Sequence, residues 1–490
     1  MQASDANLLR QALRESLPPV DQAGSHDERE PAFTYVPPSH AKALDADCSL
    51  VEGIRGSGKS FWWAHLVSEP HRRFIEVAFP DIRLAHDTVA VQAFGAQANS
   101  QDAPSQDVMS ALAAKHPPRA LWRAVLAHKA GFQAPFPANG KWSERVGWVD
   151  HNPEDFDELL TKRDAELHAQ GKTLVVMFDA LDRLANDWPG IRALARGLMQ
   201  VALEMRSTRR IRLKLFMRPD MLQDKAIVGF PDASKLLARR AQLVWRQVDL
   251  YALLFQCLAN APTGGALFRQ LTKSQLGMAW TRATGVWQLP VALRSDEDVQ
   301  EQAFILLAGK AMGAGPSGYK RGKPYTWLVN HLQDGLDQVS PRSYAAAVAR
   351  AAESTPPDHP LPLYFKAIES GVRAASEIRV NEVTAEDYPW VDLVMRPLKG
   401  NLIVPCTQQD IERLWRQDGT IGSLKARLSS QDAALVKLPP QNLDLGATGL
   451  LDDLAALGLV KRMNDRRIQM PDVYRIAFGL GRKGGVKPVK

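Results

Sequence analysis

The sequence predicts an α/β core with a mainly parallel sheet, followed by an α-helical region and a winged-helix-like C-terminal domain. The first observation is the alternation of short apolar runs with helically spaced segments from about residue 47 to residue 246. The second is the loss of strand signals and the dominance of helical periodicity over 248–354. The third is the order of three predicted helices and a hairpin over 407–470, which is the order of a winged helix.

The composition is typical of a soluble protein with several domains. The chain has 490 residues, of which 45% are hydrophobic and 23% charged, so two or three domains are expected. It contains no apolar run long enough to span a membrane, and its first residues lack the apolar core of a signal peptide. Cys48, Cys257 and Cys406 are widely spaced, form no metal or redox motif, and suit a reducing compartment. A cytoplasmic location is therefore expected.

Changes in pattern along the chain predict the domain boundaries. Pro18-Pro19 ends a first helix, and a proline-rich patch at 356–362 follows the helical region. Candidate strands of the core lie at 49–53, 73–79, 173–179, 211–217 and 241–246, and residues 105–130 are expected to be helical. The expected parts are an N-terminal helix and linker (1–46), the core (47–250) with an insertion at about 81–170, a helical lid (251–355), a connecting segment (356–400), the winged-helix-like domain (401–475) and a basic tail (476–490).

One glycine-rich segment fits the phosphate-binding loop pattern G-x-x-x-x-G-K-[ST] at every fixed position. Its residues are Gly53, Ile54, Arg55, Gly56, Ser57, Gly58, Lys59 and Ser60. The glycines let consecutive backbone N–H groups point at phosphates, Lys59 can reach the β- and γ-phosphates, and the Ser60 hydroxyl can ligate Mg²⁺. The alternative is a glycine-rich turn without a ligand. A predicted strand before the loop and a predicted helix after it, over 60–68, favour a site for ATP and Mg²⁺.

An acidic residue at the end of another strand is expected to complete this site. Asp179 follows a fully apolar run, and in a parallel sheet its carboxylate emerges at the same edge as the loop. We expect Asp179 to hold Mg²⁺ through water or through Ser60, although a strand ending in Asp can also simply enter a turn. The next position, where a Glu could polarise the attacking water, is Ala180. Asp182 is then the nearest candidate to orient water, and slow hydrolysis or use of the nucleotide as a switch is expected.

Arginines at later strand boundaries are candidates for sensing or completing the site. Arg218 follows the strand predicted at 211–217 and can sense the γ-phosphate; the alternative is a surface arginine paired with Asp220. Arg239 and Arg240 precede the last predicted strand of the core. They can project into the site of a neighbouring subunit, or they can form a solvated end of a helix.

A helix start in the helical region supplies one more candidate. Ser340 is a predicted N-cap, Pro341 occupies the first helical position, and Arg342 lies in the first turn. If this helix belongs to a lid, Arg342 can reach the phosphates of the nucleotide.

Together these residues resemble the AAA+ and STAND branch of P-loop ATPases. Asp179-Ala180-Leu181-Asp182 is similar to the second motif of STAND proteins, and Arg183 departs from the acid that usually follows in that family. The order of phosphate loop, acidic strand, polar-ended strand, arginine-led strand, helical lid and C-terminal module is similar to that of the origin-recognition initiators. In those proteins the lid carries a second sensor arginine, and Arg342 matches that place.

The basic excess of the chain lies at its C-terminal end. The formal net charge is +7, and residues 461–490 carry all of it. The third helix of the predicted winged helix carries Asp452 and Asp453, which suit the major groove of DNA poorly. Docking of a protein, or a flexible basic tail, is therefore the alternative to nucleic-acid binding. The candidates for contact with nucleic acid are Lys461, Arg462, Arg466, Arg467, Arg482 and Lys483.

The expected function is that of a regulatory ATPase of AAA+/STAND type, in which bound ATP drives self-association or acts on a protein effector. Regulatory ATPases of bacterial defence systems have a similar architecture. A second hypothesis is a DNA-binding initiator, loader or transposition regulator that uses the basic C-terminal domain. A third is a scaffold that retains nucleotide without hydrolysing it, which Ala180 favours.

Overall fold

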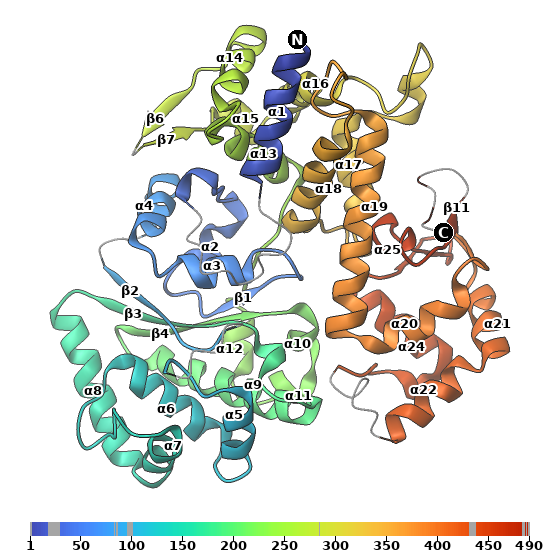
Figure 1. Cartoon of the computed structure of the whole chain (residues 1–490). Helices are drawn as coiled ribbons and strands as arrows, with labels where there is room; N and C mark the ends of the chain where they lie inside the picture. The colour runs from blue at the N-terminus through green and yellow to red at the C-terminus, as the bar shows by residue number, and fades with distance from the viewer. Residues whose placement is uncertain are drawn as a thin grey trace. The chain divides into compact units, whose positions relative to one another are not determined.

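The computed structural model describes residues 2–17, 30–82, 84, 87–95, 101–283, 285–430, 438–482, 486 and 488. The described backbone divides into two compact units, both drawn in Figure 1. The sheet unit comprises residues 36–244, and the helical unit comprises residues 2–17, 30–35 and the described residues from 245 onward.

Five parallel strands form the centre of the sheet unit, in the spatial order β2-β3-β4-β1-β5. Their bounds are Leu50–Glu52 for β1, Thr88–Gln92 for β2, Thr173–Phe178 for β3, Ile211–Met217 for β4 and Ala241–Gln242 for β5. In this order β4 lies between β1 and β3, so the strand that precedes the glycine-rich loop is not the neighbour of the strand that precedes Asp179. The predicted α/β core with a parallel sheet is confirmed.

Helices cover both faces of this sheet (Figure 1). Helices α3 (Lys59–His65) and α4 (Glu69–Ala78) lie on one side, and α6 (Pro118–Ala130) and α9 (Trp188–Glu204) lie on the other. Alternate side chains of β3 follow this division, as expected for a strand buried on both faces. Met177 belongs to the cluster that includes Trp62 and Trp63 of α3, and Phe178 makes an edge-to-face contact with Trp122 of α6 at 5.6 Å.

One predicted strand of the sheet unit is wrong, and one strand of the sheet was not predicted. The segment 73–79, predicted as a strand, belongs to helix α4, because a short apolar run does not distinguish a strand from a helix and Pro70 occupies the first turn. The strand at that edge of the sheet is β2, inside the segment assigned to the insertion. The helix expected over 105–130 is interrupted near Pro117, which precedes α6.

The remaining helices of this unit are α2 (Ala41–Leu44), α5 (Gln106–Ala113), α7 (Trp142–His151), α8 (Pro153–Ala169), α10 (Pro219–Gln223), α11 (Lys225–Val228) and α12 (Ala233–Leu237).

A buried lysine fixes the segment that leads into β1. Lys214 of β4 is 1% exposed, and its Nζ donates hydrogen bonds to the carbonyl oxygens of Ala43 (2.7 Å), Asp45 (2.8 Å) and Cys48 (2.7 Å). Burial lowers the pKa of this ammonium group. The segment before the glycine-rich loop is therefore held by one side chain of the central sheet.

In the helical unit, α13 forms the centre of the core. Nearly all of α13 is buried, and its Tyr251 donates a hydrogen bond of 2.7 Å to the carbonyl of Tyr325. The N-terminal helix α1 packs against α13, α14 and α18, and α18 packs along α19. The bounds are Ala3–Ser16 for α1, Gln247–Asn260 for α13, Gly265–Leu276 for α14, Val291–Ser295 for α15, Glu297–Ala308 for α16, Pro324–Leu332 for α17, Pro341–Ser354 for α18, Phe365–Asn381 for α19 and Pro389–Met395 for α20.

One expectation for this unit is wrong, since strands do occur between 248 and 354. Strands β6 (Thr281–Ala283) and β7 (Val286–Gln288) pair antiparallel. Three-residue strands leave too little alternation for a sequence pattern to reveal them. Across the residues that the structure describes, no helix has the length and apolarity needed to cross a membrane.

The C-terminal module has the winged-helix order that the sequence predicts. Cys406 forms an antiparallel bridge with Ile468, and β10 also pairs with β9. Among the described residues between Cys406 and this hairpin lie the α-helices α21, α22 and α24. Thr407 caps α21 by accepting a hydrogen bond from the N–H of Asp410. The bounds are Ile403–Val404 for β8, Gln408–Asp418 for α21, Thr420–Ser429 for α22, Gly446–Ala456 for α24, Lys461–Arg462 for β9, Ile468–Gln469 for β10, Asp472–Arg475 for α25 and Gly481–Arg482 for β11.

Candidate functional site

The glycine-rich loop leaves the C-terminal end of β1 and has a tight backbone at Gly53 and Gly58. The N–H of Gly53 donates to the carbonyl of Met217 on β4, at 3.1 Å. A Cβ atom at Gly53 would lie 2.3 Å from the hydroxyl oxygen of Ser57, so a larger residue there would displace the Ser57 side chain. Gly58, with φ of 105°, turns the chain from the loop into α3. The loop therefore has the tight backbone that the phosphate-binding pattern requires.

Lys59 folds back over this loop. Its Nζ donates hydrogen bonds to the carbonyl oxygens of Gly53 (2.7 Å) and Ile54 (2.9 Å). Desolvation lowers the pKa of the Lys59 ammonium to about 8, while the nearby Asp179 carboxylate acts in the opposite direction. A phosphate group at the loop would replace two neutral carbonyl acceptors by charged ones, which bind an ammonium more strongly.

Ser60 and Asp179 meet next to Lys59. Asp179 follows β3, is 1% exposed, and its carboxylate accepts a hydrogen bond from the Ser60 hydroxyl. Burial raises the pKa of Asp179, and the hydrogen bond from Ser60 and the charge of Lys59 oppose this effect. The second carboxylate oxygen, Oδ2, has no hydrogen-bond partner in the described part of the chain. A hydroxyl beside an unsatisfied buried carboxylate oxygen fits Mg²⁺, which prefers hard oxygen ligands and keeps several water molecules.

A left-handed residue shapes the turn after Asp179. Ala180 has φ of 55°, and the chain then enters a 3₁₀ turn over Leu181–Arg183. Asp182 of this turn pairs with Arg218, with 3.5 Å between Oδ2 and Nη1. Arg218 also pairs with Asp220, with 3.1 Å between Nε and Oδ1. The predicted pairing of Arg218 with Asp220 is confirmed, but its placement at the surface is wrong, because Arg218 is buried.

The strain at Ala180 leads to a stability prediction. Replacing Ala180 by glycine should raise the free energy of unfolding by about 0.5–1 kcal/mol, since a left-handed φ is unfavourable for alanine but not for glycine. Ala193 on the exposed side of α9 is the matched control. There the same substitution should lower the free energy of unfolding by about 1 kcal/mol. Chemical denaturation of both variants checks the opposite signs, and equal signs would contradict this description of the turn.

The other predicted arginines are engaged elsewhere. Arg240 is exposed and pairs with Glu52 at the end of β1, with 2.9 Å between Nε and Oε2, and Arg239 is exposed beside it. Arg342 belongs to the helical unit, where its Nη1 lies 2.7 Å from Oε1 of Glu382. Ser340 caps α18 as predicted. The structure thus gathers Lys59, Ser60, Asp179, Asp182 and Arg218 around the loop, and it gives Arg342 an ion-pair partner within its own unit.

Most candidates for nucleic-acid contact pair with acidic side chains. The pairs are Lys461 with Asp337 (2.6 Å), Arg462 with Asp452 (2.7 Å), Arg467 with Asp465 (2.7 Å) and Arg482 with Asp472 (3.2 Å). Arg466 lies exposed in the turn of the hairpin with φ of 66°, and Lys483 lies outside the described residues. Asp452 therefore neutralises a hairpin arginine, and Asp453 is buried, where it accepts hydrogen bonds from Asn442.

Sequence patterns did not reveal two polar residues of the site. Glu52 is buried at the end of β1, where Gln242 and Arg240 both contact its Oε2. The position of Glu52 directly before the loop could have indicated that it belongs to the site. Lys214 gave no signal, because an alternating strand is compatible with a lysine on its exposed face.

The strand order, the loop that follows β1 and the acid that follows β3 define the class of the core, which is an α/β P-loop core. A helical region and a winged-helix-like module follow it in the chain. No protein-family model and no curated protein matches the sequence.

Three solved structures illustrate what the chain is similar to. The Aeropyrum pernix ORC2 protein, as ADPNP–ADP complexes, has 14% identity over 91% of this chain and 94% of that chain, with a TM-score of 0.32. Cdc6p from Pyrobaculum aerophilum has 11% identity over 92% and 94%, with a TM-score of 0.30. A chain of Drosophila ORC bound to DNA has 14% identity over 96% and 90%, with a TM-score of 0.28. The superpositions are loose, so the class of the core follows from its own strand order and loop.

Proposed function

We propose that the protein is an ATP-binding and slowly hydrolysing regulatory ATPase of AAA+/STAND type. The observation that carries this proposal is the meeting of Lys59, Ser60 and Asp179 at the carboxyl edge of the parallel sheet. This is the set of groups that a nucleoside triphosphate with Mg²⁺ needs: an ammonium for the phosphates, and a hydroxyl with a carboxylate for the metal.

In the proposed complex each group has a distinct role. Lys59 leaves the carbonyls of Gly53 and Ile54 and contacts the β- and γ-phosphates, while the N–H groups of the loop bind the remaining phosphate oxygens. Ser60 and Asp179 hold Mg²⁺, which when bound neutralises part of the phosphate charge. Arg218 lies close enough to influence the charge of Lys59, and it is the candidate for sensing the γ-phosphate.

Slow turnover follows from the residues after Asp179. Ala180 has no carboxylate, and the carboxylate of Asp182 forms an ion pair with Arg218. Asp182 would have to break its ion pair with Arg218 before it could orient the attacking water. The proposal therefore predicts tight nucleotide binding with turnover far below typical enzymes, which have a median kcat of about 10 per second. A single-turnover assay with radiolabelled ATP measures this rate, and complete retention of ATP would favour the scaffold alternative.

The affinity for ATP should depend on pH through Lys59. Desolvation lowers the pKa of the Lys59 ammonium to about 8, and bound phosphates favour the charged ammonium, so this pKa rises on binding. Affinity is then constant below pH 8 and falls above it, by up to about tenfold per pH unit, because binding takes up a proton. Calorimetric titrations at pH 7 and pH 9, in buffers with different ionisation enthalpies, measure both the affinity and the proton uptake. Equal affinities without proton uptake would contradict the role given to Lys59.

We further propose that nucleotide controls self-association or a protein effector. Arg239 and Arg240 are exposed at the C-terminal end of α12, near the start of β5, where they can meet a neighbouring subunit. The mass of the protein in solution, measured with and without ATP, tests this step. If ATP changes the mass of neither the unmodified protein nor an Arg239→Ala variant, self-association is excluded. The partner is then an effector protein. A role in bacterial defence is the setting that the architecture suggests.

Contact with duplex DNA is the second candidate, which the winged-helix order favours. The ion pairs of Lys461, Arg462 and Arg467 are solvent-exposed, so exchanging their carboxylates for phosphates costs little. Duplex binding measured by fluorescence anisotropy should then weaken with salt, and Arg466→Glu should weaken it further. Binding that ignores Arg466 would exclude the hairpin as the contact surface.

A further inference from the structure

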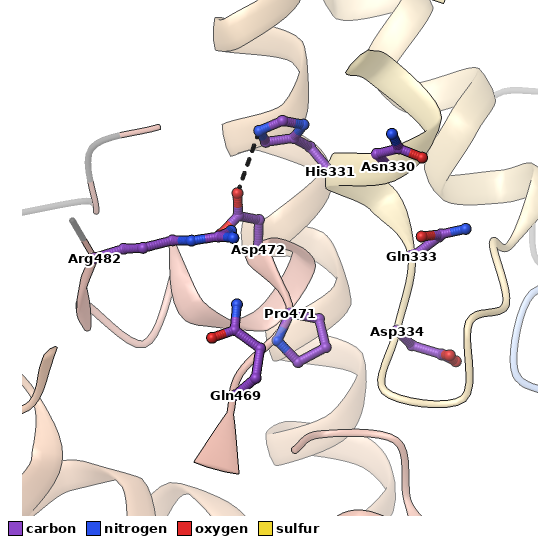
Figure 2. Close-up of a pocket in the computed structure, with 8 residues that line it drawn as sticks. All are labelled: Asn330, His331, Gln333, Asp334, Gln469, Pro471, Asp472 and Arg482. Carbon is purple, nitrogen blue, oxygen red and sulfur yellow. Dashed lines mark hydrogen bonds and ion pairs between the residues drawn. The ribbon is translucent and has the colours of Figure 1, made fainter. Parts of the chain in front are cut away.

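A polar pocket lies inside the helical unit, apart from the loop and the carboxylates described above. Its volume is about 340 Å³, and Figure 2 shows the eight side chains that line it. Four come from the end of α17 and the turn after it, three come from β10, α25 and β11, and Pro471 directly precedes α25. The lining residues are Asn330, His331, Gln333, Asp334, Gln469, Pro471, Asp472 and Arg482.

The hydrogen bonding of His331 determines which of its nitrogens is free. Nδ1 lies 2.7 Å from the carbonyl oxygen of Trp327, and the imidazole stacks on the Trp327 ring at 3.8 Å. A carbonyl oxygen only accepts, so Nδ1 carries the hydrogen. In the neutral ring Nε2 is then a bare acceptor. Figure 2 shows this nitrogen facing Oδ2 of Asp472, at 3.4 Å. Two acceptors therefore face each other across the pocket wall.

Asp472 is fixed by its other oxygen. Oδ1 accepts hydrogen bonds from Nε of Arg475 (2.6 Å) and Nη1 of Arg482 (3.2 Å). Oδ2 is buried and has no hydrogen-bond partner in the described part of the chain. Oε1 of Gln469 is likewise buried without a partner among those residues. Two acceptor atoms, Nε2 of the neutral His331 ring and Oδ2 of Asp472, thus face each other in the pocket, and the Asp472 side chain is 2% exposed. Buried acceptors without donors are costly, so this arrangement indicates a missing positive group.

The separation of 3.4 Å identifies that group. Two ligands at about 2.05 Å from one ion, with a tetrahedral angle between them, are about 3.3–3.4 Å apart. A histidine that ligates a metal commonly donates its other N–H to a backbone carbonyl, which is the bond that His331 makes to Trp327. We propose that His331 Nε2 and Asp472 Oδ2 bind one divalent transition-metal ion, with Zn²⁺ the ion that this ligand pair favours.

The remaining positions of the ion are taken by water, for which the pocket has room. Arg475 and Arg482 share the charge of Asp472, so the affinity is moderate and binding is reversible. Because His331 belongs to α17 and Asp472 to α25, the ion joins the helical region to the winged-helix-like module. Zn²⁺ therefore stabilises this junction, independently of any nucleotide.

Titration of the full-length, EDTA-treated protein with Zn²⁺ tests the proposal, with Mg²⁺ as the control ion. The expected result is binding of Zn²⁺ and a rise in the melting temperature, and His331→Gln should weaken binding by roughly tenfold or more. His116→Gln is the matched control, because His116 already makes a direct 2.7 Å contact with Asp150 and leaves no space for an ion. This control should bind Zn²⁺ like the unmodified protein.

Three results would overturn the proposal. One is equal Zn²⁺ affinity and stoichiometry in the His331→Gln variant. Another is a melting temperature that depends on pH through His331 but does not respond to Zn²⁺. This result would mean that a proton on His331 Nε2, and not a metal ion, bridges it to Asp472 Oδ2. The third comes from X-ray absorption of the unmodified protein, which does not rely on the folding of a variant. Nitrogen and oxygen ligands at about 2.0–2.1 Å are expected, whereas sulfur ligands would place the ion at a cysteine.

Discussion

Replacing Lys59 by alanine is expected to weaken ATP binding by roughly 100-fold or more. The ammonium group is the charged donor of the loop, and each hydrogen bond from a charged group to phosphate contributes about 1.5–3 kcal/mol. Lys59 also donates hydrogen bonds to the carbonyl oxygens of Gly53 and Ile54, so the variant loses these two bonds as well as the contact with phosphate, and its melting temperature is measured beside its affinity. Equilibrium binding of a fluorescent ATP analogue measures the loss.

Lys235→Ala is the matched control for this experiment. Lys235 lies on α12 of the same unit, is exposed, and pairs with Asp232 on the surface. The control should bind ATP like the unmodified protein, because surface pairs of this kind contribute little. Near-normal ATP affinity in the Lys59→Ala variant would show that the loop is not the nucleotide site.

Replacing Lys214 by methionine is expected to lower the free energy of unfolding by about 3–5 kcal/mol. Methionine is similar in length but donates no hydrogen bond, so the carbonyls of Ala43, Asp45 and Cys48 lose a buried charged donor. The melting temperature of the sheet unit should fall by roughly 10 °C. Differential scanning calorimetry measures the shift.

The control for this effect is again Lys235, replaced by methionine. Exposed substitutions of this type change stability by less than about 0.5 kcal/mol. A shift in the Lys214→Met variant no larger than in this control would mean that the buried ammonium does not hold the segment before β1. A large shift with retained ATP binding would separate the stability of this segment from the chemistry of the loop.

The parts of the fold that were predictable are those with a dense local signal. The glycine-rich loop matches all four fixed positions of its pattern, and the strand before it is a buried run, so loop and strand could be placed together. The fully apolar strand before Asp179 could be placed because the strands of a parallel sheet are buried on both faces and read as continuous apolar runs. The three helices and hairpin of the C-terminal module carried caps and turn residues at recognisable spacing.

The parts that were not predictable depend on contacts between distant segments. Strand β2 is defined by its pairing with β3, eighty-odd residues later in the chain, and its own pattern is only partly apolar. Arg218 is buried because Asp182 and Asp220 together compensate its charge, which no local pattern around Arg218 reveals. The basic hairpin is likewise less cationic than its sequence suggests, since Asp337 and Asp452 pair with it from other elements.

A crystal structure with Mg²⁺ and a non-hydrolysable ATP analogue tests the central claim most directly. The account predicts the β- and γ-phosphates inside the loop 53–60, with Lys59 Nζ moved from the carbonyls of Gly53 and Ile54 to the phosphate oxygens. It also predicts Mg²⁺ beside the Ser60 hydroxyl and the Asp179 carboxylate. Phosphates bound elsewhere, with Lys59 still on the two carbonyls, would contradict it.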